Sequence, residues 1–334
     1  MNVFQDILAA GEVWMQALRQ LLAGHPLVQS GLDAVALAAA LTALAAFAGL
    51  GVVSGAARLL AVTRRRASYE KCARQLALLA LALGWPLLVG GRIWLFFAHD
   101  SYTPDSLPAF MAEMAWILLG LSVLVSSLYF SLWKFLPKLP VLHAALGIIS
   151  GLQGWFALAA TLAAARLQAA FVRPDAASLT LGDIFLPGWF SPFWCALYAS
   201  LPLILGLAGG AGALWLALRR RRDDFGRDHY NVMIPWCAVW ARHAWALFWL
   251  FLLFAAGLTI QAHRQTGAFT TLDALWESGR LLLWLAPAAL WTVVSRSAAP
   301  LRHKPTLILA LLLAMTCLPF YFFTGITAIT LVRP

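Results

Sequence analysis

Charged side chains are scarce in this chain. Of its 334 residues, 11% are Asp, Glu, Lys or Arg, whereas 62% are hydrophobic. A soluble globular domain carries roughly 25% charged residues, so most of this surface must face something other than water. The net charge is +10, but the basic residues sit in a few short segments. That pattern indicates membrane topology and not nucleic-acid binding.

Cysteine is also rare. The chain has four, Cys72, Cys195, Cys237 and Cys317, none in CxxC spacing and three within apolar runs. This arrangement argues against a disulfide framework or a zinc site and predicts small buried residues instead. The GxGxxG, Walker A, HExxH and CxxCH motifs are absent as well, so the sequence gives no support to nucleotide binding, a zinc protease site or covalently attached haem.

The chain does contain a series of long apolar runs. A bilayer core about 30 Å thick is crossed by about 20 residues of helix, and a helix satisfies its backbone hydrogen bonds within its own segment. The expected fold class is therefore all-α, a polytopic transmembrane helix bundle with about eight spans. The predicted spans are 32–62, 74–98, 109–136, 140–171, 189–218, 232–260, 275–295 and 306–331.

A different pattern precedes these runs. Within residues 1–24, apolar residues recur at helical spacing among Gln, Asp and Glu, for example at Val3, Ile7, Trp14 and Leu18. Such spacing predicts an amphipathic helix that lies on the membrane surface. We therefore expect a surface helix over 1–24, followed by a single transmembrane bundle over 25–334.

Loop charge predicts the orientation. The basic residues follow the first, third, fifth and seventh predicted spans, while the alternate loops carry few. They are Arg64, Arg65, Arg66, Lys71, Arg74, Lys134, Lys138, Arg219, Arg220, Arg221, Arg222, Arg227, Arg296, Arg302 and Lys304. Because basic loops stay in the cytoplasm, we expect a multi-pass protein of a bacterial cytoplasmic (inner) membrane. Both termini would then lie on the outer, periplasmic side.

Two histidines lie within predicted spans, where an ionisable group is a functional hypothesis by default. His143 lies about one turn into the fourth span, and His243 lies toward the middle of the sixth, beside Arg242. Haem iron takes histidine ligands, so both are candidates for binding haem b or relaying protons. The alternative is a histidine hydrogen-bonded inside the bundle. By helix rise, His243 is about 12 Å deeper than His143, which is too far for the two to share one haem iron.

Five charged residues lie toward the outer half of the spans. They are Arg92, Glu113, Glu277 and Arg280, together with Arg166, which is not part of the candidate pocket. One interpretation is an outer pocket for a quinol head group, in which arginine and glutamate orient hydroxyls and accept protons. The other is that they snorkel toward the interface or form structural ion pairs.

Several stretches, in order along the chain, resemble motifs of one family. Ser131-Leu132-Trp133 precedes His143 where the family has a Gly-Trp-containing stretch before a His that opens the fourth span. That span ends near Gln168, with Pro174 after it, where the family has Trp-Met-Gln-x-Pro. The run from Phe185 to Cys195 stands where the family's next span opens with an Asn-Pro loop, a basic residue and Phe-x-His.

The last two stretches complete the comparison. Trp276-Glu277-Ser278-Gly279-Arg280-Leu281-Leu282 stands where the family has a Trp followed by Phe-Arg-Ile-Met-Val-Gly. Gly325 through Arg333-Pro334 stands where the family's eighth span ends in Gly-Trp-x-x-x-Glu-x-Gly-Arg-Gln-Pro-Trp. Taken in order over nearly the whole chain, these stretches resemble subunit I of the cytochrome bd quinol oxidases. Glu113, His143, Arg280 and Arg333 match its pattern.

The departures from the family fall on its haem ligands. The predicted first span contains no His. The family's fifth-span His falls near Cys195, its seventh-span Met at Leu282 and its eighth-span Glu near Thr330. The loop at about 261–275 is also too short to be the family's quinol-binding loop. Because haem iron needs axial ligands of the right type, the resemblance implies the bundle without family-type haem sites.

The leading hypothesis is therefore a non-catalytic membrane subunit of a respiratory electron-transfer complex. It would contact membrane lipid and pair with a haem-bearing homologous subunit or a c-type cytochrome. A second hypothesis is a redox-active, quinol-handling subunit that uses the outer pocket and His243. A third is a transporter or transport accessory, with Arg242 and His243 forming a substrate site near the bilayer centre.

Overall fold

The computed structural model describes residues 13, 26–97, 107–136, 139–171, 192–265 and 270–331. Eight long helices account for most of this described part. They are α2 (Pro26–Thr63), α3 (Ala67–Phe97), α4 (Leu107–Ser131), α5 (Pro140–Phe171), α7 (Pro192–Asp223), α8 (Arg227–Gln265), α9 (Thr271–Arg296) and α10 (Lys304–Leu331). Two short 3₁₀ helices, η2 (Leu132–Lys134) and η4 (Pro300–Arg302), follow α4 and α9. The predicted all-α bundle is confirmed.

Each predicted span falls on one of these helices. Among the residues described, seven helices are long and apolar enough to cross a membrane, and α10 contributes a shorter apolar stretch, Lys304–Pro319. The chain is thus a multi-pass membrane protein. The predicted surface helix over 1–24 lies outside the described residues, apart from Val13.

Several helices extend beyond the predicted spans at their charged ends. Lys71, which precedes the predicted span 74–98, belongs to α3, and Arg219 to Arg222, which follow the predicted span 189–218, belong to α7. Hydropathy marks only the apolar part of a helix. Backbone hydrogen bonding continues past it wherever long basic side chains can reach water.

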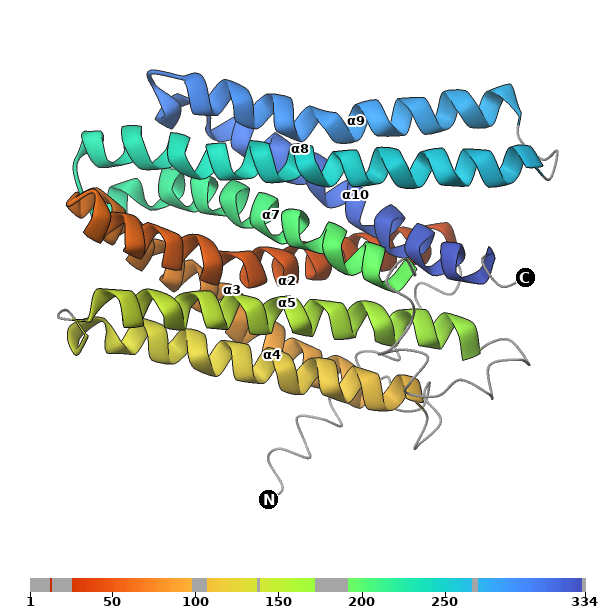
Figure 1. Cartoon of the computed structure of the whole chain (residues 1–334), viewed down its shortest axis with the longest axis horizontal. Helices are drawn as coiled ribbons and strands as arrows, with labels where there is room; N and C mark the ends of the chain where they lie inside the picture. Colours follow the sequence, from red (N-terminus) through yellow and green to blue (C-terminus); the bar gives the residue numbers. More distant parts are fainter. Residues whose placement is uncertain are drawn as a thin grey trace.

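The helices run roughly along the long axis of the molecule (Figure 1). Helix α2 is central, because it packs against α3, α5, α7 and α10. Helix α4 packs on α5 at one edge of the bundle, while α8 and α9 pack together at the opposite edge (Figure 1).

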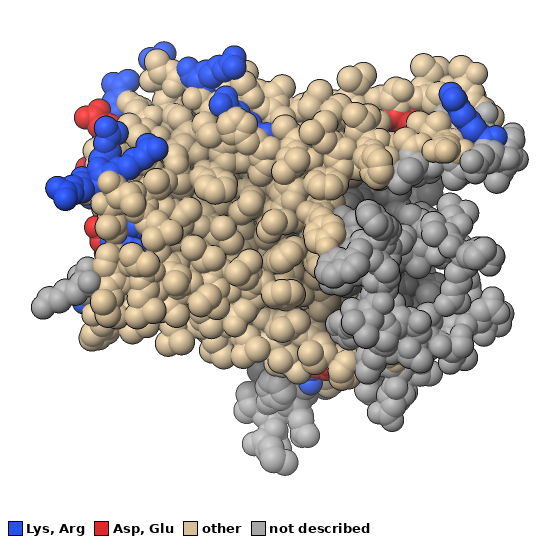
Figure 2. Space-filling view, viewed as in Figure 1, with Lys and Arg blue, Asp and Glu red and all other residues tan. Residues whose placement is uncertain are grey.

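Basic side chains gather at one end of the bundle (Figure 2). The turn between α2 and α3 meets the C-terminal end of α7 there. The exposed basic residues are Arg64, Arg65 and Arg66 in that turn and Arg220, Arg221 and Arg222 in the last turn of α7. We call this the basic end. Two of the four loops predicted to share one side of the membrane therefore lie at one end of the structure (Figure 1 and Figure 2).

Glycine brings α2 and α5 into backbone contact. A Cβ atom on Gly51 would lie 2.6 Å from both the Gly147 carbonyl oxygen and the Gly151 nitrogen, and one on Gly151 would lie 2.8 Å from the Ala48 carbonyl oxygen. Gly51 and Gly55 on α2, like Gly147 and Gly151 on α5, are spaced by four residues, so each pair lies on one helix face. Small residues at this spacing let membrane helices approach closely.

A second close contact joins α7 and α8. A Cβ atom on Gly209 would lie 2.6 Å from the Ala241 nitrogen, and one on Gly206 would lie 3.2 Å from the Trp245 nitrogen. A Cβ atom on Gly210 would lie 2.6 Å from the Trp291 ring of α9. The glycines of α7 therefore serve close helix packing.

Tryptophan N–H groups tie helices together inside the bundle. Trp245 donates to the Trp284 carbonyl oxygen at 2.8 Å, and Trp249 donates to that of Leu281 at 2.8 Å, both joining α8 to α9. Trp116 of α4 donates to the Leu88 carbonyl of α3 at 2.9 Å. Where no water is present, an indole N–H can donate only to protein acceptors such as these carbonyl oxygens. These hydrogen bonds therefore fix the relative positions of neighbouring helices.

Trp245 and Trp291 provide a matched test of these bonds. Both rings are fully buried and lie edge to face at 5.7 Å, but the Trp291 N–H has no partner among the described residues. We expect Trp245→Phe to lower the free energy of unfolding by about 1 to 2 kcal/mol more than Trp291→Phe, because only the first loses a hydrogen bond. Unfolding in mixed micelles measures both, and equal losses would mean that only ring volume matters.

Candidate functional site

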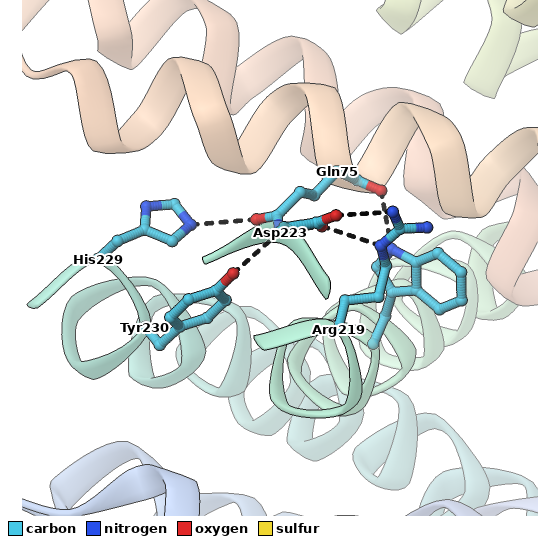
Figure 3. Close-up of polar contacts among 6 residues, drawn as sticks. Gln75, Arg219, Asp223, His229 and Tyr230 are labelled. Atoms are coloured by element: carbon cyan, nitrogen blue, oxygen red, sulfur yellow. Dashed lines mark hydrogen bonds and ion pairs between the residues drawn. The ribbon is translucent and has the colours of Figure 1, made fainter. Parts of the chain in front are cut away.

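A buried polar cluster joins α3, α7 and α8 at the basic end (Figure 3). Gln75 of α3 donates from its side-chain nitrogen to Asp223 Oδ2 at 2.7 Å and to the Tyr230 hydroxyl at 3.5 Å. Its Oε1 lies 3.0 Å from His229 Nε2. Because Oε1 can only accept, His229 must donate from Nε2. Gln75, His229 and Tyr230 are buried, so one amide connects three helices.

Arg219 completes this cluster. Its Nε donates to Asp223 Oδ2 at 2.8 Å and its Nη2 to Oδ1 at 2.7 Å, a bidentate pair one turn apart on α7. The Arg219 guanidinium also lies 5.1 Å from the ring centre of Trp215, whose N–H donates to the Gln75 carbonyl oxygen at 3.0 Å. The carboxylate is therefore fully engaged. This geometry fits a clamp between helices and not an acid–base site.

Gln75, Asp223, His229 and Tyr230 were not among the predicted site residues, and Arg219 was predicted only as a basic residue that follows the fifth span. Gln75 lies within an apolar run, and Asp223 and His229 lie beside the arginine-rich turn, where they resemble ordinary loop residues. The one available signal was an uncharged polar residue inside a predicted span, which needs a partner in hydrocarbon.

His143 lies in a second buried cluster, in the first turn of α5. Its Nε2 lies 2.7 Å from the Tyr129 carbonyl oxygen, and its ring packs against Tyr129 at 4.5 Å and Trp133 at 4.7 Å. A carbonyl only accepts, so Nε2 carries the proton. Nδ1 has no partner among the described residues. His143 is fully buried, which fits the alternative of a histidine bonded inside the bundle.

The same cluster reaches α2 and α3. The Tyr129 hydroxyl lies 3.0 Å from Ser54 Oγ, which donates to the Ala73 carbonyl oxygen at 2.7 Å. Arg58 pairs with Glu70 at 2.6 Å, and its guanidinium lies 5.4 Å from the ring centre of Trp133. The polar groups around His143 thus bond one another across α2, α3 and α4.

His243 has quite different surroundings. It is exposed on α8 and lines a shallow groove beside α7. Its neighbour Arg242 instead faces α9, where Nη1 donates to Ser295 Oγ at 3.0 Å. The structure therefore separates Arg242 from His243, which the transporter hypothesis placed in one substrate site.

The four outer charged residues form two separate ion pairs. Arg92 Nη1 of α3 contacts both Glu113 oxygens of α4, at 2.8 and 2.9 Å, and the two side chains are 54% and 49% exposed. Glu277 and Arg280 pair within one turn of α9. Because α9 lies at the opposite edge of the bundle from α4 (Figure 1), the structure does not bring the four together into one pocket.

The structure also bears on the cysteines and on the predicted absence of a metal site. Cys72, Cys237 and Cys317 are buried and free of disulfides, and the described residues contain no group of three or more His, Cys, Asp or Glu side chains that could hold a metal ion. The side chain of Cys195 and the whole of Arg333 lie outside the described part of the chain.

The structure also bears on whether a haem of the family type would fit. His143 Nε2 is hydrogen-bonded to a backbone carbonyl oxygen. His243 lies on the exterior of the bundle. Leu282 has no ligand atom and is exposed. Among the described residues, the positions of His243 and Leu282 therefore do not match the ligand set of such a haem.

Comparison with known proteins gives no further guidance. The chain matches no protein-family model, no curated protein and no solved structure.

Proposed function

We propose that this chain is a non-catalytic membrane subunit of a respiratory electron-transfer complex of the cytochrome bd oxidase type. It would lie in the cytoplasmic membrane of a bacterium, with the basic end in the cytoplasm and both termini outside. The observation that carries the non-catalytic role is the backbone contact between helices in both halves of the bundle.

Direct helix contact leaves little room for a cofactor at the bundle centre. Gly51 packs directly against the backbone of α5, and Gly209 packs against the backbone of α8. At both positions an added Cβ atom would lie 2.6 Å from a backbone atom of the neighbouring helix, which is a steric clash. A haem needs a flat cavity and axial ligands. The packing therefore favours a scaffold over a haem carrier, and it agrees with the missing family ligands.

The Arg92–Glu113 pair supports a partner at the outer side. Both side chains are about half exposed on a helical surface that otherwise presents apolar residues such as Ile93 and Phe110. Charged groups are costly at a lipid surface, and a partner that covers the pair would provide polar contacts. In the proposed orientation this surface lies near the outer face. A haem-bearing homologous subunit or a c-type cytochrome could dock there.

Optical spectroscopy tests the proposal. We expect the chain purified alone in detergent to show no b-type haem in a reduced-minus-oxidised spectrum with pyridine haemochrome quantitation. The tagged chain purified from its native membrane should bring down a haem-bearing protein. Stoichiometric haem b in the isolated chain would contradict the proposal, and His143 and His243 would become the first residues to mutate.

A pair of double variants locates the partner surface. Replacing Arg92 and Glu113 with leucine should remove the co-purified haem signal. Replacing Glu277 and Arg280 with leucine deletes the same residue types at the other edge and should leave the signal intact. Equal effects of the two changes would count against the α3–α4 surface.

A further inference from the structure

One exposed face of α3 carries two basic residues at the basic end. Lys71 and Arg74 are three residues apart, so they are neighbours on one side of the helix, and both are exposed. Among the described residues, neither forms an ion pair with a carboxylate. Like charges at this spacing repel each other, and an anion bound between them would relieve that repulsion.

The Lys71 ammonium is already positioned. Its Nζ lies 5.0 Å from the ring centre of Phe225, in the turn that follows α7. This cation–π contact restricts a side chain that would otherwise be free to move. A ligand that binds the ammonium therefore pays a smaller entropy cost.

Arg74 lies at the edge of the hydrocarbon layer. The next charged residue of α3 is Arg92, and residues 75–91 contain none. At about 1.5 Å per residue the two arginines are about 27 Å apart along the helix, close to the thickness of a bilayer core of about 30 Å. Arg74 is therefore at the depth of the lipid phosphates on the side of the basic end.

The same face of α3 continues into the hydrocarbon as an apolar strip. Leu78 is half-buried, and Ala82, Trp85 and Val89 are exposed on the following turns. They follow Arg74 at intervals of three or four residues, so they lie below it on one face. Trp85 is about 16 Å from Arg74 along the helix, about half the core thickness. The strip therefore matches one acyl chain of a single leaflet.

The arginines at the end of α7 lack such a strip. Arg220 and Arg221 are exposed, but every residue from 202 to 217 of α7 is buried or half-buried. A lipid whose phosphate lay at those arginines would find little exposed surface on α7 for its acyl chain. Only on α3, of these two helices, do basic residues and a lipid-facing strip share one face.

The surroundings favour a headgroup with net negative charge. Every phospholipid has a phosphate, but in a zwitterionic lipid an ammonium group accompanies it. Arg64, Arg65 and Arg66 are exposed at the same end of the bundle and would repel that ammonium. The headgroup of phosphatidylglycerol has no positive charge, so it avoids this repulsion.

We propose that this face of α3 binds one anionic phospholipid. Lys71 and Arg74 donate to the phosphate oxygens, and one acyl chain runs along the strip from Leu78 to Trp85. The site goes beyond general contact with membrane lipid, because it specifies the charge of the headgroup. It also goes beyond the proposed companion role, since it requires neither a haem nor a partner subunit.

Lipid titration tests this site. The chain in detergent, in about 0.15 M ammonium acetate so that long-range attraction is screened, is titrated with phosphatidylglycerol or phosphatidylcholine of identical acyl chains. Native mass spectrometry counts the bound lipid. We expect one tight, saturable phosphatidylglycerol, bound at least about tenfold more tightly than phosphatidylcholine. Glycerophosphoglycerol, which has the headgroup without acyl chains, should not compete.

Paired variants separate the site from general charge. Lys71→Gln with Arg74→Gln should weaken phosphatidylglycerol binding about thirtyfold, as expected for two bases that contact one phosphate. Arg220→Gln with Arg221→Gln removes the same charge from the end of α7 and should weaken it less than about threefold. Lys71→Arg with Arg74→Lys keeps both charges and should stay within about threefold of the parent chain.

Three results would overturn the site: equal affinity for the two lipids, equal losses from the two glutamine pairs, or competition by glycerophosphoglycerol. The lipid comparison uses the parent chain, so it decides the question even where a variant fails to fold. None of these measurements involves haem or a partner, so the lipid site and the proposed function succeed or fail separately.

Discussion

Gly51→Val is expected to lower the free energy of unfolding by more than about 3 kcal/mol, beyond the cost of most overpacked cores. The added Cβ alone would lie 2.6 Å from the Gly147 carbonyl oxygen, and a backbone atom cannot move aside as a side-chain tip can. The substitution must push α2 away from α5. Because α2 also packs on α3, α7 and α10, the shift would disturb the whole bundle. Unfolding in mixed micelles gives the loss.

Gly90→Val is the matched control. Gly90 lies within α3 and is exposed, and a Cβ atom added to it would meet no other atom within 4 Å. Valine there should change the free energy of unfolding by less than about 1 kcal/mol, because it adds helix propensity without a clash. If both valines are equally harmful, backbone contact between α2 and α5 is not what makes Gly51 necessary.

Gln75→Leu should cost about 2 to 5 kcal/mol of unfolding free energy, since it leaves two buried groups, His229 Nε2 and the Tyr230 hydroxyl, without their partner. Asp223 would keep its bidentate bonds to Arg219. Gln261→Leu, at an exposed position on α8, is the control and should be close to neutral.

A double-mutant cycle separates the hydrogen bond from the packing. When His229→Leu is added to Gln75→Leu, both members of the 3.0 Å pair become apolar and no buried donor of that pair is left without a partner. The double variant should therefore be less destabilised than the sum of the single variants, by about 1 kcal/mol or more. Strict additivity would show that the cluster does not act as a clamp.

The membrane spans could be predicted closely because the property that defines them is local. A run of about 20 apolar residues must form a helix in lipid whatever its neighbours are. The packing role of Gly206 and Gly209 was also predictable, since small residues at membrane depth serve close helix approach.

Contacts between distant segments could not be predicted in this way. Gln75 and Asp223 are 148 residues apart in sequence, and Gln75 and His229 are 154 apart. Nothing in either segment specifies the other. Their meeting depends on α3 packing beside the α7–α8 turn.

The sequence by itself determined the helices, their order and the clustering of positive charge. Only the tertiary structure decided which face of each helix is buried. His143 and His243 both lie within apolar runs of the sequence. In the structure, His143 is enclosed by Tyr129 and Trp133, whereas His243 is exposed on the exterior of the bundle. Arg92 and Glu277 likewise belong to separate ion pairs. The physical reason is that a transmembrane helix is apolar on all sides, so its hydrophobic pattern does not distinguish the face that meets lipid from the face that meets protein.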